Sequence, residues 1–404
     1  MPPYGDLSVP SRGVVVKRRY LAVAVVAAIS ATAGQVPVSA PAAAAAPDGW
    51  GQAAAHATGD YYNAGETRLT PAAAGRLKPR WNVPLENAIC AAPAVPLVGA
   101  NRLVTAASYR ISGYDATTGA LAWRTPAPSK KTSISLAAIV GTRLVAQSRD
   151  CRSGKTFLTT HNVTTGKVLY SKRIPETMYN VLVDKGIVVG GVWDAAISKY
   201  GIRAYRIADG SPVWARQGSI AGETVAAGGK ILVVGDDTTT AVDVTTGKAL
   251  WPADAGCFTP IGASPDGATF YMRCGPDERI RSVSAATGAV IRTFPSHGAT
   301  SGFATDGERL YLHSFAHELI AIDAHNGRRA WTATFTEDAP IMFAVGGGVV
   351  YGWRDNGHPL SAFEARTGSP IKLDAKTSAL QGAPMVANGR LYGRTGSTVT
   401  AYAP

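Results

Sequence analysis

Cysteine is scarce in this chain of 404 residues, which contains four, and no two of them are adjacent or spaced as Cys-x-x-Cys. The sequence therefore lacks the paired thiolates that are typical of zinc sites and of dithiol redox centres. It also lacks the Gly-x-Ser-x-Gly, His-Glu-x-x-His and phosphate-loop motifs. These absences exclude the enzyme classes that a single motif identifies, while a triad assembled from distant residues stays open.

Charged residues are few, at 17%, and the formal net charge is +12. The Lys and Arg residues are scattered, without the dense runs that are typical of nucleic-acid patches, so we expect no specific nucleic-acid partner. A basic surface attracts anionic polymers, including those of a cell wall, or serves solubility alone. The composition leaves both interpretations open.

No apolar run near the N-terminus reaches the ~20 residues that a membrane-spanning helix needs. The run from Leu21 to Ala33 follows Lys17-Arg18-Arg19 and precedes the Ala-rich residues 42–46. This is the layout of a secretory signal, so we predict a signal peptide at residues 1–46 and a secreted, extracellular or cell-envelope location. Retention of the run as an uncleaved anchor is the alternative; after cleavage we expect no stable membrane span.

The even number of cysteines agrees with export to an oxidising compartment. Cys257 and Cys274 lie symmetrically about the turn sequence at residues 264–267. If that turn closes a hairpin, the two cysteines face each other across the strands. We therefore predict a Cys257–Cys274 disulfide and, by default, a Cys90–Cys151 disulfide.

A ten-residue design recurs along the chain. In Val242–Trp251 an apolar strand end is followed by Asp, a Thr-Gly turn and a second strand with Trp, and close copies are Tyr114–Trp123 and Ile322–Trp331. Asp115, Asp243 and Asp323 are predicted to shape turns rather than to catalyse, because a carboxylate can accept bonds from turn amides. Tyr170, Arg292 and Lys372 replace Trp in three units, where we expect weaker packing.

The turn glycines recur about every 40 residues, at separations of 47, 44, 37, 41, 39 and 41. A period near 40 with four strands per unit is typical of a β-propeller blade. Glycine suits these hairpins because one turn residue takes a positive φ. The blade-turn glycines are Gly119, Gly166, Gly210, Gly247, Gly288, Gly327 and Gly368.

The two ends of the repeat region complete each other. Residues 397–402 match a third strand without a fourth, and the strand around Trp81 is a fourth strand without the first three. Joining them closes the ring and removes exposed sheet edges. We predict an all-β, eight-bladed β-propeller with tryptophan-docking-type repeats, whose last blade is completed by an N-terminal strand. The predicted domains are a lead-in segment at residues 47–74, with a helical turn capped by Thr70, and one propeller at residues 75–404.

The Asp-x-x-Thr-Gly-x-x-x-Trp design resembles the repeat of the quinoprotein-like eight-bladed propellers. The lead-in, with Trp50, Asp60, Asn63 and Leu69-Thr70-Pro71, is similar to that of the same superfamily. Its members include alcohol dehydrogenases that use pyrroloquinoline quinone and propellers without enzyme activity. The resemblance covers roughly residues 48–404 and implies the scaffold.

The enzymes of that superfamily hold the quinone between a Trp and a disulfide of adjacent cysteines, over a calcium ion. This sequence has no adjacent cysteines, and no group of its residues can be matched to the calcium ligands. We therefore expect no cofactor, no metal ligand and no catalytic residue. Pyrroloquinoline quinone with calcium is the alternative.

Loops between second and third strands gather at one mouth of a propeller channel, and loops on a rigid scaffold commonly carry function. His313 and His317 in this set are also considered as metal ligands, although a His pair without a third ligand is more often structural. The whole set is also consistent with an ordinary solvated rim. The candidate binding rim consists of Arg149, Arg152, Trp193, Asp194, Arg273, His313, His317, Trp353, Arg354 and Asp355, with Asp236, Asp237, Asp277 and Glu278 in the same loops.

We predict an exported, non-enzymatic propeller that acts as a binding or scaffold module for a protein or an anionic cell-wall polymer, and we expect a monomer. The alternative is an enzyme, either a quinone-dependent dehydrogenase or a hydrolase or lyase acting in the channel. The absence of adjacent cysteines favours the binding module.

Overall fold

The computed structural model describes residues 49–85, 94–107, 109–127, 131–194, 199–220, 225–234, 239–253, 257–275, 279–295, 299–314, 316–335, 342–354 and 358–404. The chain divides into residues 1–44 and residues 45–404, and every described residue belongs to the second unit. The predicted signal peptide at residues 1–46 therefore lies outside the described residues, as does Cys90. Within the described part, no helix is long and apolar enough to cross a membrane.

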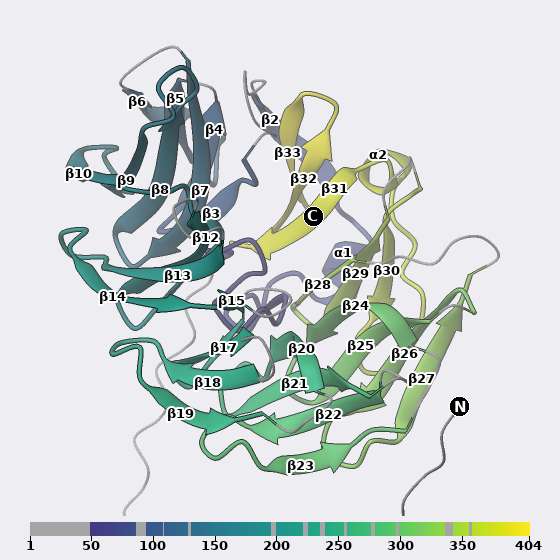
Figure 1. The fold of residues 1–404 in the computed structure, drawn as a ribbon. Helices are drawn as coiled ribbons and strands as arrows, with labels where there is room; N and C mark the ends of the chain where they lie inside the picture. The colour runs from purple at the N-terminus through teal and green to yellow at the C-terminus, as the bar shows by residue number, and fades with distance from the viewer. Residues whose placement is uncertain are drawn as a thin grey trace, which may run out of the picture. The chain divides into compact units, whose positions relative to one another are not determined.

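Eight sheets follow one another around a ring, which confirms the predicted eight-bladed propeller (Figure 1); all described strand pairs are antiparallel except one short parallel pair in blade 7. The first four blades run in chain order from the innermost to the outermost strand. In blade 4 two short strands share the innermost position. Their strands are β3 (Leu97–Gly99), β4 (Arg102–Ala107), β5 (Arg110–Asp115), β6 (Leu121–Pro126); β7 (Thr132–Val140), β8 (Arg143–Asp150), β9 (Thr156–Asn162), β10 (Val168–Ile174); β11 (Tyr179–Asp184), β12 (Ile187–Asp194), β13 (Lys199–Arg206), β14 (Pro212–Gln217); β15 (Ser219–Ile220), β16 (Ala226–Ala227), β17 (Lys230–Val234), β18 (Thr239–Asp243) and β19 (Ala249–Pro252).

Blades 5 to 8 continue the order, with two departures. Blade 7 has three strands of its own and gains β1 (Tyr62–Asn63) on its inner edge, while blade 8 takes its outermost strand, β2 (Lys78–Pro84), from the other end of the chain. The remaining strands are β20 (Cys257–Ala263), β21 (Thr269–Cys274), β22 (Arg279–Ser284), β23 (Val290–Thr293); β24 (Ala299–Thr305), β25 (Arg309–Ser314), β26 (Glu318–Asp323), β27 (Arg329–Thr334); β28 (Met342–Gly346), β29 (Val349–Trp353), β30 (Ser361–Glu364); β31 (Gln381–Ala387), β32 (Arg390–Thr395) and β33 (Thr398–Ala403).

The ring closes through β2 and β33, as the sequence predicts. The two strands pair antiparallel, with Trp81 opposite Ala401 and Val83 opposite Val399. Two short helices accompany this closure, α1 (Pro71–Ala74) and α2 (Ala375–Ser378). Thr70 caps α1 by accepting a bond from the Ala73 amide, and Pro71 takes the first helical position, which confirms the predicted helical turn.

The tryptophans of the repeat join each blade to the next. Trp331 donates its indole N–H to the Ala365 carbonyl of blade 7 at 3.0 Å, and Trp123, Trp214 and Trp251 make the corresponding bond to blades 2, 4 and 5. Trp81 does the same between blades 8 and 1 by donating to Thr117 at 2.9 Å. The repeat is therefore the blade-to-blade fastening that the sequence predicts.

Each docking ring lies flat on a turn glycine of the following blade. A Cβ added to Gly368 would lie 2.5 Å from the Trp331 ring, and one added to Gly247 would lie 2.6 Å from the Trp214 ring. All seven blade-turn glycines adopt a positive φ between 68° and 77°. Two separate reasons therefore require glycine at these positions: the positive φ of the backbone, and the indole ring that leaves no room for a Cβ.

The three blades without Trp differ from one another. The Tyr170 ring covers Gly210 much as an indole does, with 2.6 Å to an added Cβ, so packing is not weak there. Arg292 leaves 3.5 Å above Gly327, which agrees with weaker packing. Lys372 precedes blade 8, whose third and fourth strands come from opposite chain ends. That blade has no turn for a Trp to cover.

The aspartates of the repeat shape turns, as predicted. Asp243 accepts bonds from the amides of Thr245 and Thr246 at 2.9 and 2.8 Å. The Thr245 hydroxyl donates to the same carboxylate oxygen at 2.6 Å. This hydroxyl bond, assisted by the Thr246 hydroxyl and the two amides, lowers the pKa of Asp243.

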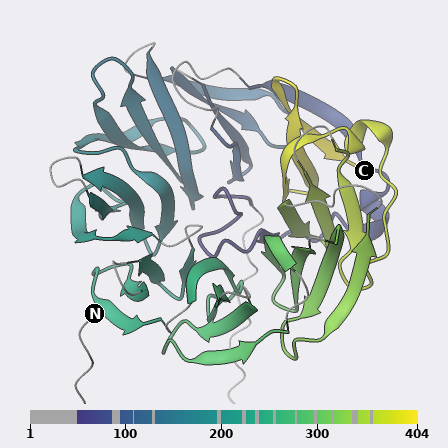
Figure 2. The same cartoon turned by 45° about the vertical axis from the view of Figure 1, so that its right-hand side comes forward.

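The lead-in forms hydrogen bonds to the inner edges of successive blades and so connects them, a feature that the sequence did not predict. Figure 2 shows it in purple at the centre of the ring. Backbone bonds tie it to six blades in chain order: Trp50 to Val98, Gly51 to Ile139, Ala57 to Ala226, Thr58 to Ala263, Asp60 to Thr305 and Tyr61 to Val345, all between 2.7 and 2.9 Å. Side chains reach the other two blades, since Gln52 bonds to Val183 and Asn63 to Val386.

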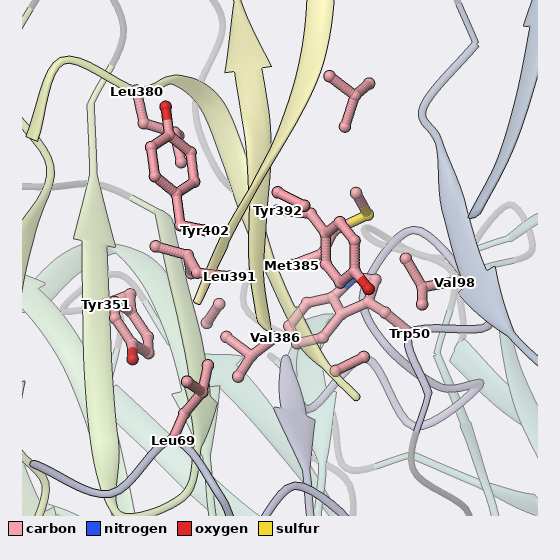
Figure 3. Close-up of a cluster of buried hydrophobic side chains, with 14 of the residues drawn as sticks. Trp50, Leu69, Val98, Tyr351, Leu380, Met385, Val386, Leu391, Tyr392 and Tyr402 are labelled. Atoms are coloured by element: carbon pink, nitrogen blue, oxygen red, sulfur yellow. The ribbon is translucent and has the colours of Figure 1, made fainter. Parts of the chain in front are cut away.

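A large apolar cluster anchors both ends of the lead-in. Trp50, which is 1% exposed, packs with Val98, Met385 and Tyr392, and Leu69 is fully buried in the same cluster (Figure 3). The cluster spans blades 1, 7 and 8, where the two chain ends meet. The lead-in is therefore part of the core of the propeller.

The predicted Cys257–Cys274 disulfide is present between directly opposed residues of β20 and β21. Cys151 is also disulfide-bonded, and its predicted partner Cys90 lies outside the described residues. The first bridge closes a loop with a sequence separation of 17.

We expect replacement of Cys257 and Cys274 together by Ala to lower the free energy of unfolding by about 3 kcal/mol, because the unfolded chain regains the loop entropy. Denaturant unfolding of the purified protein measures this loss. Peptide mapping without reduction should find the two cysteines linked, and a free thiol at either position contradicts the assignment.

Candidate functional site

The two faces of the ring differ in the loops that form them. Second and third strands are joined on one face, which we call the mouth face, and the other hairpin turns lie on the opposite face, which we call the turn face. Arg149, Arg152 and Arg273 lie at or beside the mouth-face ends of β8 and β21. His317 follows β25, and Arg354 follows β29. By their positions in the strand order these candidate rim residues lie on the mouth face, distributed over four blades.

Several candidate rim residues do not form an exposed surface. Trp353 is 9% exposed and packs in the large apolar cluster with Tyr351, and His313 is 7% exposed on β25. The prediction of Trp353 as a rim contact is corrected, because its side chain points into the core. The backbone of Asp194 ends β12. Its side chain and the residues Asp236, Asp237, Asp277, Glu278 and Asp355 lie outside the described part.

The structure brings Trp193 together with two tyrosines that the sequence did not single out. We call Trp193, Tyr200 and Tyr179 the aromatic patch; they lie on β12, β13 and β11 of blade 3. The Trp193 and Tyr200 rings meet edge to face with centroids 4.9 Å apart, and those of Tyr200 and Tyr179 are 6.2 Å apart. Trp193 and Tyr200 are cross-strand partners, so their symmetric placement about the hairpin loop was the signal available in the sequence.

The aromatic patch is open to solvent. Trp193 is 48% exposed and Tyr200 is 54% exposed, whereas no other of the eight tryptophans is exposed. Burial, followed by the neighbouring Tyr200, raises the pKa of Tyr179, which therefore stays neutral at physiological pH. Large contiguous exposed apolar patches are typical of interaction surfaces, whereas scattered single apolar residues are ordinary.

A polar pocket of about 250 Å³ lies next to the aromatic patch, between blades 2 and 3. The Gln147 amide closes its floor by bonding both the N–H and the carbonyl of Met178, at 2.8 and 3.0 Å. Arg149, a candidate rim residue, lines the pocket, and Tyr179 follows Met178 directly. The mouth face thus places a guanidinium, hydroxyl groups and aromatic rings side by side. The pocket is lined by Ser133, Ser135, Gln147, Arg149, Cys151, Thr177 and Met178.

These features define an eight-bladed propeller of the quinoprotein-like type with an exposed aromatic surface on one face. The family described as outer membrane protein assembly factor BamB matches residues 22–253 and 276–371. The chain belongs to this family. No curated protein matches the sequence.

Solved structures with the same fold include both enzymes and propellers of the matched family. Quinohemoprotein alcohol dehydrogenase from Comamonas testosteroni is 15% identical, with a TM-score of 0.59, over 89% of this chain and 81% of that chain. BamB from Moraxella catarrhalis is 19% identical, with a TM-score of 0.55, over 81% of this chain and 97% of that chain. Identities this low establish the fold alone.

The chain lacks one element of the quinone site of the enzymes, the disulfide of adjacent cysteines. The described disulfide joins Cys257 and Cys274, which lie 17 positions apart in the sequence and are 1% and 2% exposed within blade 5. No two cysteines of the sequence are adjacent, so the adjacent-cysteine disulfide cannot form. Among the described residues, no group of three or more His, Cys, Asp or Glu side chains is arranged to hold a metal ion.

Proposed function

We propose that this chain is an exported, non-enzymatic propeller that binds a protein partner on its mouth face through the aromatic patch. The proposal rests on one observation, the exposed and mutually contacting rings of Trp193 and Tyr200. Trp, Tyr and Arg are the residues that dominate the energy of protein interfaces, and Arg149 lies in the adjoining pocket. Membership in a family described by an assembly factor supports a scaffold role in the cell envelope.

Export is part of the proposal. The predicted signal peptide at residues 1–46 and the described disulfide both support an oxidising compartment outside the cytoplasm. Residues 1–46 contribute +3 of the net charge of +12, so the exported chain keeps a charge of +9, which favours an acidic partner.

Photo-crosslinking in the native host tests the binding surface. A photoreactive residue at Tyr200 should capture a defined protein. The same residue at Ile291, which is 58% exposed on the outer strand of blade 5, should not capture it. We expect Trp193→Ala to weaken binding of the captured protein, once purified, by about 30-fold, the loss typical of an interface hot spot. Equal capture at both positions, or unchanged affinity of the Trp193→Ala variant, overturns the proposal.

Quinone reconstitution tests the enzymatic alternative. The purified protein is mixed with pyrroloquinoline quinone and calcium, and dye reduction by alcohols or sugars is followed. We expect neither stoichiometric quinone binding nor dye reduction, because the adjacent-cysteine disulfide is missing. Turnover in this assay establishes a dehydrogenase instead.

A further inference from the structure

A basin of about 620 Å³ lies on the turn face, at the opposite end of the channel from the proposed partner surface. The lead-in forms one side, through residues between Gly51 and Ala64, and the turns after the innermost strands of blades 2 to 5 form the other. Its volume is in the range of small-molecule sites, about 300–1,000 Å³. The function proposed above does not use this basin.

Apolar side chains form much of the basin wall. Ile139 and Val140 come from blade 2, Val183 from blade 3, Ala226 from blade 4 and Pro265 from blade 5. Val140 is 40% exposed and Pro265 is partly exposed, whereas Ile139 and Val183 are only 9% and 3% exposed, so Val140 and Pro265 offer the accessible apolar surface. A ligand with an apolar body would cover this wall and gain about 25 cal/mol for each Å² removed from water.

The charges in the basin oppose those of the rest of the molecule. Three carboxylates, Asp60, Asp184 and Asp266, line it with one ammonium group, Lys185. With neutral histidine the basin carries a formal charge of −2, in a protein whose net charge is +12. An isolated acidic region inside a basic protein attracts cations and repels anions.

The three carboxylates have different surroundings. Asp60 is 1% exposed and already accepts bonds from the Thr58 hydroxyl and the Tyr62 amide, at 2.9 and 3.2 Å, so it is structural. Asp266 is exposed and uses Oδ1 for the Ser264 hydroxyl and the Ala268 amide.

Asp184 is half-buried, and burial raises the pKa of its carboxyl, a shift that the Lys185 amide and charge oppose. A cation beside Asp184 would therefore relieve a cost of burial.

The side chain of Lys185 extends toward blade 4. Its backbone adopts a positive φ of 46°, and its side chain lies across Gly229 of blade 4, with Cε 2.7 Å and Nζ 3.2 Å from an added Cβ. Its stem thus forms part of the rim between two blades. Its charge limits the affinity of the basin for cations but does not cancel the carboxylates.

We propose that this basin binds an organic amine, a cation whose ammonium group is attracted by the carboxylates of Asp184 and Asp266 and whose apolar body covers Val140 and Pro265. The charge of the basin selects the ammonium group, and the apolar wall selects the body. The basin and the mouth face lie at opposite ends of the channel. The proposal of amine binding therefore does not depend on the proposal of a protein partner.

Titration calorimetry with three probes tests the proposal. Phenethylamine should bind the full-length exported protein at least about tenfold more tightly than phenethyl alcohol or 3-phenylpropanoate, because charge-assisted bonds contribute more than neutral ones. Asp184→Asn and Asp266→Asn should each remove most of this preference. Lys185→Ala should strengthen amine binding by removing a like charge.

Glu308→Gln provides the matched control, because it removes one negative charge from a turn-face side chain that is 72% exposed and outside the basin. It should leave amine binding unchanged, and thermal unfolding of every variant verifies the fold. The proposal is overturned if the amine and the alcohol bind equally, or if the folded Asp184→Asn and Asp266→Asn variants retain the preference.

Discussion

Deletion of Gly49–Glu66 is expected to abolish cooperative folding of the propeller. The lead-in bonds to six blades through its backbone and to two more through Gln52 and Asn63. At about 1 kcal/mol for each bond, with about 3 to 5 kcal/mol for the burial of Trp50, the loss matches the whole stability of about 5–15 kcal/mol that is typical of a domain. Denaturant unfolding followed by tryptophan fluorescence should show no cooperative transition.

Two point variants in the lead-in test whether the loss of stability depends on the buried contacts. Trp50→Ala should lower the free energy of unfolding by about 3 to 5 kcal/mol, because its side chain is 1% exposed and fills the cluster that joins the chain ends. Ala64→Ser, in the same segment at an exposed position, should change it by less than about 0.5 kcal/mol. A deletion variant with the wild-type transition midpoint contradicts this connecting role.

Replacement of Trp331 by Ala is expected to cost about 3 to 5 kcal/mol of stability. The substitution removes the hydrogen bond to Ala365 and uncovers Gly368. It also removes the ring contacts with Tyr311 and Phe363, whose centroids lie 5.9 and 6.4 Å from that of Trp331. The interface between blades 6 and 7 loses its fastening. Thermal and denaturant unfolding of the purified variant measure the loss.

Arg292→Ala is the matched comparison, since Arg292 holds the corresponding position between blades 5 and 6. Its side chain stays 3.5 Å above Gly327 and donates to the Asn326 carbonyl at 3.4 Å in an exposed contact. A change of less than about 0.5 kcal/mol is expected. Similar losses for the two variants would mean that the indole is not what fastens the blades.

The ring and its closure were predictable because they rest on local chemistry that repeats. The turn glycine, the Asp beside it and the Trp that follows each recur with every blade, and the incomplete ends match each other. The connection of the blades by the lead-in was not predictable. It depends on backbone groups of residues such as Gly51, Ala57 and Thr58, and such bonds leave no side-chain pattern.

The binding surface was predictable only in part, for a physical reason. Trp193 and Trp353 each lie at the mouth-face end of a second strand, yet one is exposed and the other is buried. Each blade packs against a neighbour on both faces, so its strands carry apolar residues on both sides. The sequence therefore does not reveal whether a Trp at the end of such a strand points into the core or into solvent. Tyr200 is found only when the register of β12 and β13 is known.

The interlocking of the two chain ends has a consequence for the time course of folding. Asn63 contacts Val386, a separation of 323 residues, and Trp81 pairs with Ala401. The N-terminal part of the chain is synthesised first but finds its last partners only when the C-terminal strand exists. Contacts of such long range make folding slow. The chain therefore leaves the ribosome without a closed ring, and the eight blades complete one another only after the last strand has been made.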